Sequence, residues 1–452
     1  MCKLRNIGLA VCLFSSASAV HALEVSFRGV SHEVLSYTPD RNSGLESVYV
    51  AYDASQIQEM IISGAGNVSG VSKYSNLGGG YAVPVDYSLS DGNVVIASPA
   101  GDTGYIFEAD GRTVCIWLVD YLHYRLAISS AHASEEQECE NTRIDIVGSG
   151  EPVYYYSIDG RQCELSREID IDYLNLAWDE QSESFIQERI TKSVAHISNP
   201  IVISPPLYCN STFSIYGDRF LKAWGMEQHV ESELVYANGL DVRTTAEQTN
   251  LPDDDDPDAD ASNMIKTETQ GIGGSAPADI SFRAFTTDAV IHNEWQIASD
   301  QDFEHIDYRF NEQNLDYTFT EEGTYYVRFV GSNADGSCET AGETYTVGIG
   351  SSDLRIPNAF TPNEDGVNDV WKVAYRSLLE FSCTIFDRYG NELFHFKDPT
   401  QGWDGKYKGK YVKPGVYFYV IEAKGADGTR YRKGGDINLI RSKRYSNSSS
   451  TE

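Results

Sequence analysis

Aspartate–glycine pairs recur along this chain between runs of aromatic and β-branched residues. They stand at positions 91–92, 110–111, 159–160, 335–336, 365–366, 404–405 and 427–428. The dipeptide favours tight hairpin turns, because both of its positions tolerate positive φ. Segments between the turns, such as 143–146 and 168–173, alternate apolar and charged side chains with the period of a β-strand. We therefore predict an all-β protein built from β-sandwiches in series.

One segment, residues 54–63, is the best candidate for a helix. Asp53 precedes it as a candidate N-cap, and Ile57 and Ile61 have the spacing of one helix face. Residues 48–50, just before it, are instead typical of a strand. We therefore expect at most this one short helix in an otherwise β-rich chain.

The N-terminus has the features of an export signal. Lys3 and Arg5 precede an apolar stretch over residues 7–14, and a small-x-small cleavage pattern ends at Ala22. A buried helix, a membrane anchor and a lipoprotein signal at Cys12 are the alternatives. The stretch is too short to span a bilayer of about 30 Å, and Cys12 lacks a small residue before it. We predict a cleaved signal peptide, and no later segment has the length of a transmembrane helix.

The distribution of charge divides the rest of the chain. At 452 residues the protein is too long for one hydrophobic core. Residues 23–353 hold 17 basic and 55 acidic side chains, whereas residues 354–452 hold 16 basic and 12 acidic ones. The net charge of −32 disfavours binding to nucleic acid or anionic lipid, which would require a local basic patch. The last segment is expected to be a module with its own role.

A second boundary is marked by an acidic run rich in proline and glycine. Residues 251–275 include consecutive aspartates at 253–256, and like-charge repulsion keeps such a segment extended. Calcium binding by this run is the alternative to a solvated linker. The predicted parts are a signal peptide (1–22), two β-sandwich modules (23–150 and 151–250), the linker (251–275), a third sandwich (276–350), a C-terminal module (354–441) and a tail (442–452).

The C-terminal module contains five ordered blocks of residues. They are IPNAFTPNEDGVND at 356–369, IFDRYG at 385–390, GWDG at 402–405, PGVYFY at 414–419 and GDINLIR at 435–441. This segment resembles the gliding-motility-associated C-terminal domain, the type B sorting domain of type IX secretion substrates in Bacteroidetes. The resemblance implies recognition by the type IX secretion machinery, passage across the outer membrane, and release or retention at the cell surface.

Three departures from that family pattern stand out. Glu364 occupies a position where the family usually has Gly, which removes backbone freedom from the opening loop, and Tyr389 stands where it usually has Trp. Residues 442–452 run past the usual end of the domain. Independently of the family, residues 381–386 and 392–396 are expected to be strands joined by a turn, with Trp403 and Tyr417 packed in the core.

The module before it resembles, more weakly, a PKD-like or immunoglobulin-like domain. The residues that carry this likeness are GTYYVR at 323–328, SNADG at 332–336 and the strand tryptophan Trp295. The Gly-Asp-Gly loop that usually follows this Trp is missing. The resemblance implies a β-sandwich over residues 276–350.

Six cysteines lie beyond the predicted signal peptide. They are Cys115, Cys139, Cys163, Cys209, Cys338 and Cys383. An exported chain meets an oxidising compartment, where several disulfide connectivities are open. Cys338 and Cys383 lie in different predicted modules, so one or both could stay free. Without a Cys-x-x-Cys pair or a His-rich cluster, a structural zinc site is not expected.

Short sequence signatures of catalysis are missing. The His32-Glu33 pair has no second His at zinc-ligand spacing, and neither a Gly-x-Ser-x-Gly elbow nor a phosphate-binding Gly-Lys-Ser/Thr loop occurs. We therefore expect a chain that is not an enzyme and carries no cofactor. Spatially assembled sites escape such searches, so a polysaccharide-degrading enzyme or a carbohydrate-binding protein with its site in residues 23–250 is the alternative.

One loop of the C-terminal module has the composition of a calcium site. Asn363, Asp365, Asn368 and Asp369 gather hard oxygen ligands around Gly366. The alternative, which we prefer, is a turn in which these side chains bind their own backbone. Calcium is thus the one metal that the sequence suggests.

Two further surfaces are candidates for partner binding. Residues 154–156 are three consecutive tyrosines, of which at least one should face outward unless a neighbouring module covers it. A basic cluster near the C-terminus consists of Arg430, Arg432, Lys433, Arg441, Lys443 and Arg444. It suggests an anionic partner such as surface polysaccharide or the acidic modules, although ordinary packing and a charge-protected strand edge are the simpler explanations. We expect an exported protein, at the cell surface or outside the cell, that acts as a non-catalytic structural or adhesive arm.

Overall fold

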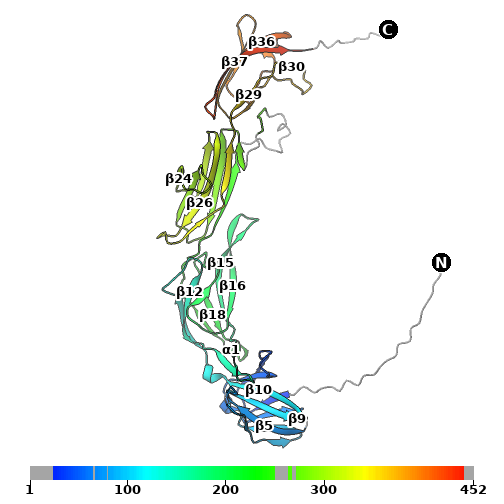
Figure 1. Cartoon of the computed structure of the whole chain (residues 1–452), viewed down its shortest axis with the longest axis vertical. Helices are drawn as coiled ribbons and strands as arrows, with labels where there is room; N and C mark the ends of the chain where they lie inside the picture. Colours follow the sequence, from blue (N-terminus) through cyan, green and yellow to red (C-terminus); the bar gives the residue numbers. More distant parts are fainter. Residues whose placement is uncertain (1–23, 65–66, 79, 250–262, 267–270, 442–452) are drawn as a thin grey trace, which may run out of the picture.

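The structure, a computed structural model, describes residues 24–64, 67–78, 80–249, 263–266 and 271–441. The predicted signal peptide, the aspartate run of the linker and the tail lie outside the described residues. Within them the regular structure is almost entirely β-strand, with one α-helix, α1 (Arg219–Ala223), and the 3-10 turns η1 (Ala54–Gln56) and η2 (Tyr121–Tyr124). The predicted all-β fold is confirmed. Figure 1 shows an elongated molecule with the first and the C-terminal modules at opposite ends.

The first module is a sandwich of two sheets. One has the order β1 (Glu24–Arg28), β4 (Glu59–Ser63), β8 (Asn93–Ala97) and β7 (Ser88–Ser90). The other has the order β2 (Leu35–Tyr37), β3 (Ser47–Ala51), β10 (Arg112–Asp120), β9 (Thr103–Ala109), β5 (Val68–Tyr74) and β6 (Val83–Pro84). The helix predicted over residues 54–63 is wrong. Asp53 does cap a turn, but only η1, and Ile61 and Ile62 belong to β4, a strand with three consecutive buried residues. Such a strand has no polar alternation to distinguish it from a helix.

The second module begins before the predicted boundary at residue 150. One sheet has the order β11 (Ala127–Ala133), β12 (Thr142–Ser149) and β17 (Ile201–Ile203). The other has the order β16 (Ser184–Val194), β15 (Ile169–Asp179), β18 (Ser214–Gly217) and β19 (Gln228–Glu231). Because β12 pairs with β17, the boundary at 150/151 cuts through a sheet and must move to about residue 126. A hairpin of β13 (Val153–Tyr156) and β14 (Gln162–Leu165) extends from this module to the first one.

The third module also starts earlier than predicted. One sheet has the order β20 (Val242–Gln248), β22 (Ala278–Thr286) and β25 (Asn314–Phe319). The other has the order β21 (Ile272–Gly274), β28 (Tyr345–Ile349), β26 (Gly323–Ser332), β23 (His292–Ala298) and β24 (Tyr308–Phe310), and β27 (Glu339–Ala341) also pairs with β26. Since β20 pairs with β22, the boundary at 250 is wrong as well. Residues 272–274, assigned to the linker, form β21 and pair in parallel with β28.

The C-terminal module is built on a five-stranded sheet. Its order is β30 (Ala359–Phe360), β37 (Arg430–Leu439), β36 (Gly415–Gly425), β32 (Leu378–Phe386) and β33 (Glu392–Phe396). Two small pairs complete the module: β29 (Asp353–Arg355) with β31 (Ala374–Arg376), and β34 (Lys406–Tyr407) with β35 (Lys410–Tyr411). The strands predicted at 381–386 and 392–396 correspond to β32 and β33.

The first two modules share one hydrophobic core. Val48 and Trp117 from the first module belong to the same cluster of buried side chains as Ile169 and Phe213 from the second. The hairpin closes this junction, because the Tyr155 hydroxyl accepts a hydrogen bond from the Asp40 backbone N–H at 2.7 Å. Tyr155, the middle residue of the three tyrosines, is therefore buried in the junction.

A fully buried ion pair lies in the same junction. Arg167 and Asp218 are 2.6 Å apart, and both side chains are completely inaccessible to solvent. Arg167 also donates to the backbone carbonyls of Glu151 and Tyr124. Asp218 accepts from the Tyr121 hydroxyl at 3.1 Å and, as the N-cap of α1, from the Leu221 N–H at 2.9 Å. Every charged atom of the pair thus has a partner from one module or the other.

The second and third modules are joined covalently. Cys139 and Cys338 form a disulfide whose Cα atoms are 5.9 Å apart, across 199 residues of sequence. Of Cys338 and Cys383, one or both of which were expected to stay free, Cys338 is therefore bonded and Cys383 is free. The loop of Cys139 is also fixed by Asn238, whose side chain donates to the carbonyls of Glu138 and Asn141. The described free cysteines, Cys115, Cys163, Cys209 and Cys383, are all buried.

Removal of the Asp218 carboxylate should destabilise the first two modules strongly. In Asp218→Ala the Arg167 guanidinium stays buried without its counter-ion, which typically costs about 3–5 kcal/mol. Urea unfolding of the full chain measures the loss. Glu59→Ala, which breaks the exposed Arg28–Glu59 pair, is the matched control and should change stability by less than about 1 kcal/mol. Equal unfolding midpoints for the two variants would contradict this account.

Reduction of the Cys139–Cys338 bond should loosen the second junction without unfolding either module. Modules joined by modest interfaces move relative to each other unless a cross-link prevents it. We expect Cys338→Ser to broaden the distance distribution in small-angle X-ray scattering. Cys209→Ser, which removes a free buried thiol, should leave the distribution as in the wild type, and an unchanged distribution in Cys338→Ser would show that the disulfide is dispensable for rigidity.

Candidate functional site: the C-terminal module

The opening loop of the C-terminal module is organised by one carboxylate. Asp369 accepts hydrogen bonds from the backbone N–H groups of Asn363, Glu364 and Gly366, each at 2.7 Å. Partial desolvation raises the pKa of Asp369, but these backbone N–H bonds outweigh it and leave the pKa below its usual value. A depressed pKa means that the charged carboxylate stabilises the loop above about pH 4 and that this stabilisation is lost as the pH falls further.

The structure brings three of the four predicted calcium ligands together. The Asn363 amide donates to Asp365 at 2.8 Å, and Asp365 accepts from the Val367 N–H at 2.9 Å. Asn368 uses its backbone carbonyl, which accepts from the Thr361 N–H at 2.8 Å. Among the described residues there is no group of three or more His, Cys, Asp or Glu side chains that could hold a metal. The loop thus has the geometry of the self-bonded turn, and calcium binding stays a prediction.

Glu364 adopts a backbone conformation that suits glycine. Its φ is +64°, in the left-handed region, where a Cβ atom is unfavourable. This explains physically why a glycine would be suited to that position. The side chain is held by the Tyr411 hydroxyl, which donates to Glu364 at 3.0 Å and links the loop to β35. The residue is therefore both strained and tethered.

Two tryptophans form the centre of the module. Trp371 and Trp403 are fully buried, and their backbones exchange hydrogen bonds of 2.9 and 3.0 Å. The Trp371 indole donates to the Pro357 carbonyl at 2.8 Å, which ties the core to the start of the loop. Tyr417 packs edge-on against Trp403, with ring centroids 5.1 Å apart. Both residues predicted as core are thus found in it, Tyr417 at its partly exposed margin.

A short upstream segment completes the module, and sequence reasoning missed it. Asn263 donates to the carbonyls of Val373 and Pro399, both at 2.6 Å, and Met264 forms an isolated bridge with Tyr375. These residues lie within the predicted linker, where the surrounding charge and glycine obscured them. No pattern in these two residues themselves points to a partner about a hundred positions away.

The junction between the third and C-terminal modules is centred on Ser377. This residue is fully buried, and its hydroxyl donates to the Gly350 carbonyl at 2.6 Å. It also exchanges hydrogen bonds with Ser275 and Ala276, which lie between β21 and β22 of the third module. The two modules therefore meet in a bonded joint.

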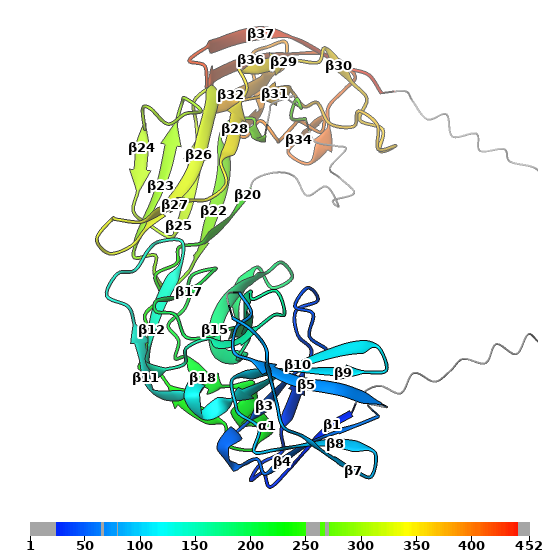
Figure 2. The ribbon, with the colours of Figure 1, turned by 60° about the horizontal axis from the view of Figure 1, so that its bottom comes forward.

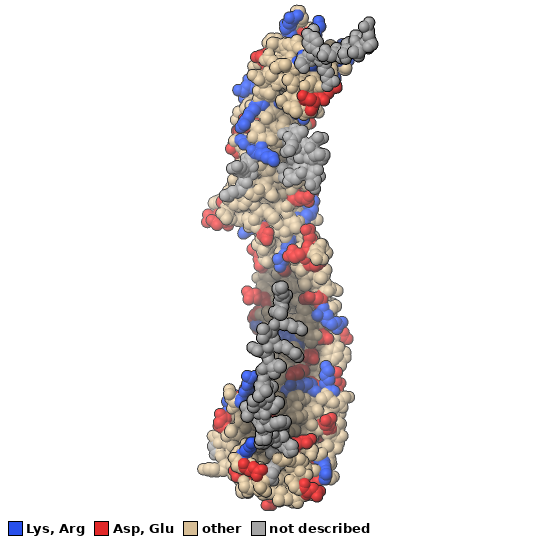
Figure 3. Space-filling view, turned by 90° about the vertical axis from the view of Figure 1, so that its right-hand side faces the viewer, with Lys and Arg blue, Asp and Glu red and all other residues tan. Residues whose placement is uncertain are grey.

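The predicted basic cluster is only partly described. Arg430, Arg432 and Lys433 are exposed on β37, and Arg432 pairs with Glu422 at 3.0 Å. The Arg441 guanidinium lies 4.9 Å from the centre of the Tyr411 ring, at the other end of the strand, while Lys443 and Arg444 lie outside the described residues. The structure thus separates the cluster into two. On the face drawn in Figure 3, acidic and basic side chains are interspersed along the molecule.

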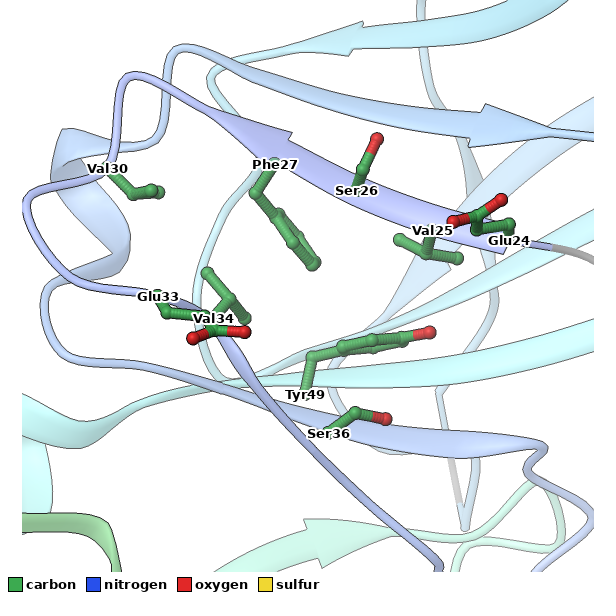
Figure 4. A pocket seen from close by; sticks show the side chains of 9 residues that line it. All are labelled: Glu24, Val25, Ser26, Phe27, Val30, Glu33, Val34, Ser36 and Tyr49. Atoms are coloured by element: carbon green, nitrogen blue, oxygen red, sulfur yellow. The ribbon is translucent and has the colours of Figure 1, made fainter. Parts of the chain in front are cut away.

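The first module has a groove of about 640 Å³ between the edge strands β1 and β2. Phe27, Val34 and Tyr49 line its floor, and the Phe27 and Tyr49 rings are 5.3 Å apart. Figure 4 shows the carboxylates of Glu24 and Glu33 at different places around the opening. They do not converge on a common point, as the acid–base pair of a glycosidase would.

The conformation of Glu364 gives a testable difference between two substitutions. Both Glu364→Ala and Glu364→Gly lose the bond from Tyr411, but only glycine relieves the left-handed strain. We expect Glu364→Gly to be more stable than Glu364→Ala by roughly 1 kcal/mol, measured by calorimetric unfolding of the full chain. An alanine variant that is as stable as the glycine variant would mean that the loop relaxes around this residue.

Comparison with known proteins gives two domain matches. Residues 354–439 match the CHU_C type IX secretion signal domain, and residues 130–232 match the fibronectin type III domain. The second match includes both β12 and β17, in agreement with the boundary drawn by strand pairing. An immunoglobulin-like domain before the C-terminal module is thereby confirmed, at residues 130–232. The match does not extend to residues 276–350, where the structure shows two sheets and the resemblance to a PKD-like or immunoglobulin-like domain stays a prediction.

Matches to whole proteins are weaker. No curated protein matches the chain. Among solved structures, dimeric latent PorU from Porphyromonas gingivalis is 8% identical, with a TM-score of 0.15, over 67% of this chain and 31% of that one. The chain thus covers about a third of that protein. The five sequence blocks and the domain match agree: the C-terminal module of this chain is a type IX secretion signal domain.

Proposed function

We propose that the protein is a type IX secretion substrate that serves, after export, as a non-catalytic structural or adhesive arm. A type IX secretion signal implies a secreted or cell-surface protein. No helix among the described residues is long and apolar enough to cross a membrane. The observation that carries the proposal is the placement of the signal domain at one end of an elongated chain of sandwiches, which leaves the acidic first module at the other end (Figure 1).

The joints between modules support a structural role. The first joint shares a core and a buried ion pair, the second has a disulfide, and the third is bonded through Ser377. An arm that must hold its far end away from a surface benefits from such joints, because each restricts bending. A polysaccharide-degrading enzyme in residues 23–250 is the competing proposal, and the separated carboxylates of the groove favour the arm over it.

Deletion of residues 354–452 should block delivery to the surface. In a host with the type IX machinery, we expect the truncated chain in the periplasm, detected by fractionation and by its resistance to added protease. The converse experiment fuses residues 240–452, which retain β20 and the segment at 263–265, to a reporter with a signal peptide. Export of the reporter would support the proposal, whereas surface delivery of the truncated chain would refute it.

A further inference from the structure

The five-stranded sheet of the C-terminal module buries only one of its faces. Along β36, Ile421 and Ala423 point into the core, while Val416, Phe418 and Val420 alternate with them and face outward. These three side chains are 49%, 43% and 49% exposed. β36 is flanked by β37 and β32, so the three apolar side chains lie in the middle of the sheet and not at its edge. In Figure 2, β36 and β37 lie on the side of the module turned away from the third module.

Strand register defines what surrounds these three residues. Residues paired directly across antiparallel strands share a face. One row across the sheet is Glu392, Phe386, Phe418 and Asp436, and the next is His395, Thr384, Val420 and Gly434. The centre of the outer face is therefore formed by Phe386, Phe418, Val420 and Gly434. We call it the outer patch.

Gly434 is the residue of this patch that the module itself does not require. Its φ is not in the left-handed region, and an added Cβ would meet nothing closer than the Tyr419 carbonyl oxygen, at an ordinary contact distance of 3.5 Å. By contrast, a Cβ at the next residue, Gly435, would lie 2.7 Å from the Tyr419 hydroxyl oxygen, so the Tyr419 side chain would have to move.

A glycine inside a strand weakens the strand, because it loses more backbone freedom on folding than other residues do. It often marks a place where another backbone approaches closely. At Gly434 the space above the strand is open on the described face, so a close approach would come from outside the module.

Acidic and basic side chains lie at different ends of the outer face. Asp436 and Glu392 stand in the row of Phe418, at the two sides of the patch. Beyond Val420, towards the end of β36, lie Lys424, Arg430 and Arg432. Lys424 pairs with Glu380 and Arg432 with Glu422, so these rows carry one positive charge in excess, at Arg430. A partner with the complementary order of charges could bind in only one direction, because like charges placed together are costly.

We propose that the outer patch, Phe386, Phe418, Val420 and Gly434, is the surface on which a protein of the secretion machinery docks. The partner places backbone or small apolar side chains over Gly434 and carries an acidic side chain opposite Arg430. This inference rests on the proposed function, since a signal domain must present a surface that can be read. It adds which of the two faces of the sheet the partner binds, and which chemical groups of the partner contact it.

The decisive variant is Gly434→Val in the full chain. Valine favours a strand, so we expect a thermal midpoint equal to or above that of the wild type. The added side chain fills the space that the partner needs, so we expect surface delivery to fall by roughly tenfold or more. Gly70→Val is the matched control: Gly70 is also a strand glycine without left-handed φ, its nearest contact is 3.7 Å away, and it lies in the first module. That variant should be exported like the wild type.

A second variant guards against an effect through folding. Phe418→Ser removes an exposed ring without adding volume, and it should also reduce delivery while the module stays folded, as judged by its calorimetric transition. If both variants are delivered normally while deletion of residues 354–452 blocks delivery, the outer patch is not the docking surface although the signal role stands. If the deletion has no effect, the proposed function itself fails. A change of oligomeric state with normal delivery would assign the patch to a second copy of the chain and overturn the proposal.

Discussion

The buried ion pair between Arg167 and Asp218 holds the first and second modules together. Ion pairs isolated from water are tolerated only when hydrogen bonds satisfy their remaining atoms, and here those bonds come from two modules. Arg167 reaches the carbonyl of Tyr124 in η2, while Asp218 starts α1 and holds the hydroxyl of Tyr121. The pair therefore couples the fold of each module to the presence of the other. The single core that spans both modules is the apolar counterpart of this coupling.

Local sequence patterns were sufficient for the class of fold and for the C-terminal module. The alternation at 168–173 and the turn at 389–391 specify strand and hairpin without help from distant residues, because period and turn chemistry are local. The helix at 54–63 failed for the same reason, since Met60, Ile61 and Ile62 are all buried in a central strand and so carry no period. The predicted module boundaries were wrong because the sequences of β12 and β20 identify them as strands but do not indicate which strands they pair with.

Of the features that matter for function, some could be predicted from the sequence and others could not. The loop around Asp369 could be predicted as a set of residues, because side chains that bind their own backbone lie close in sequence. The outer patch could not, since β36 alternates Phe418 and Tyr419 with similar apolar character on both faces, and only burial distinguishes them. The contribution of Asn263 depends on carbonyls more than a hundred residues later, which no local pattern encodes.

The segment at residues 263–265 has a mechanical consequence for the upper half of the molecule. β20 and β21 belong to the third module, whereas Asn263 and Met264, which lie between them in the sequence, contact the C-terminal module. The C-terminal module is thus bonded to three places in the preceding chain, at Asn263, Ser275 and Gly350. A single covalent connection would allow rotation, whereas these contacts oppose it, because a twist about the long axis must strain the hydrogen bonds of Asn263 and Ser377. Torque applied to the terminal domain is therefore transmitted to the sandwich below it.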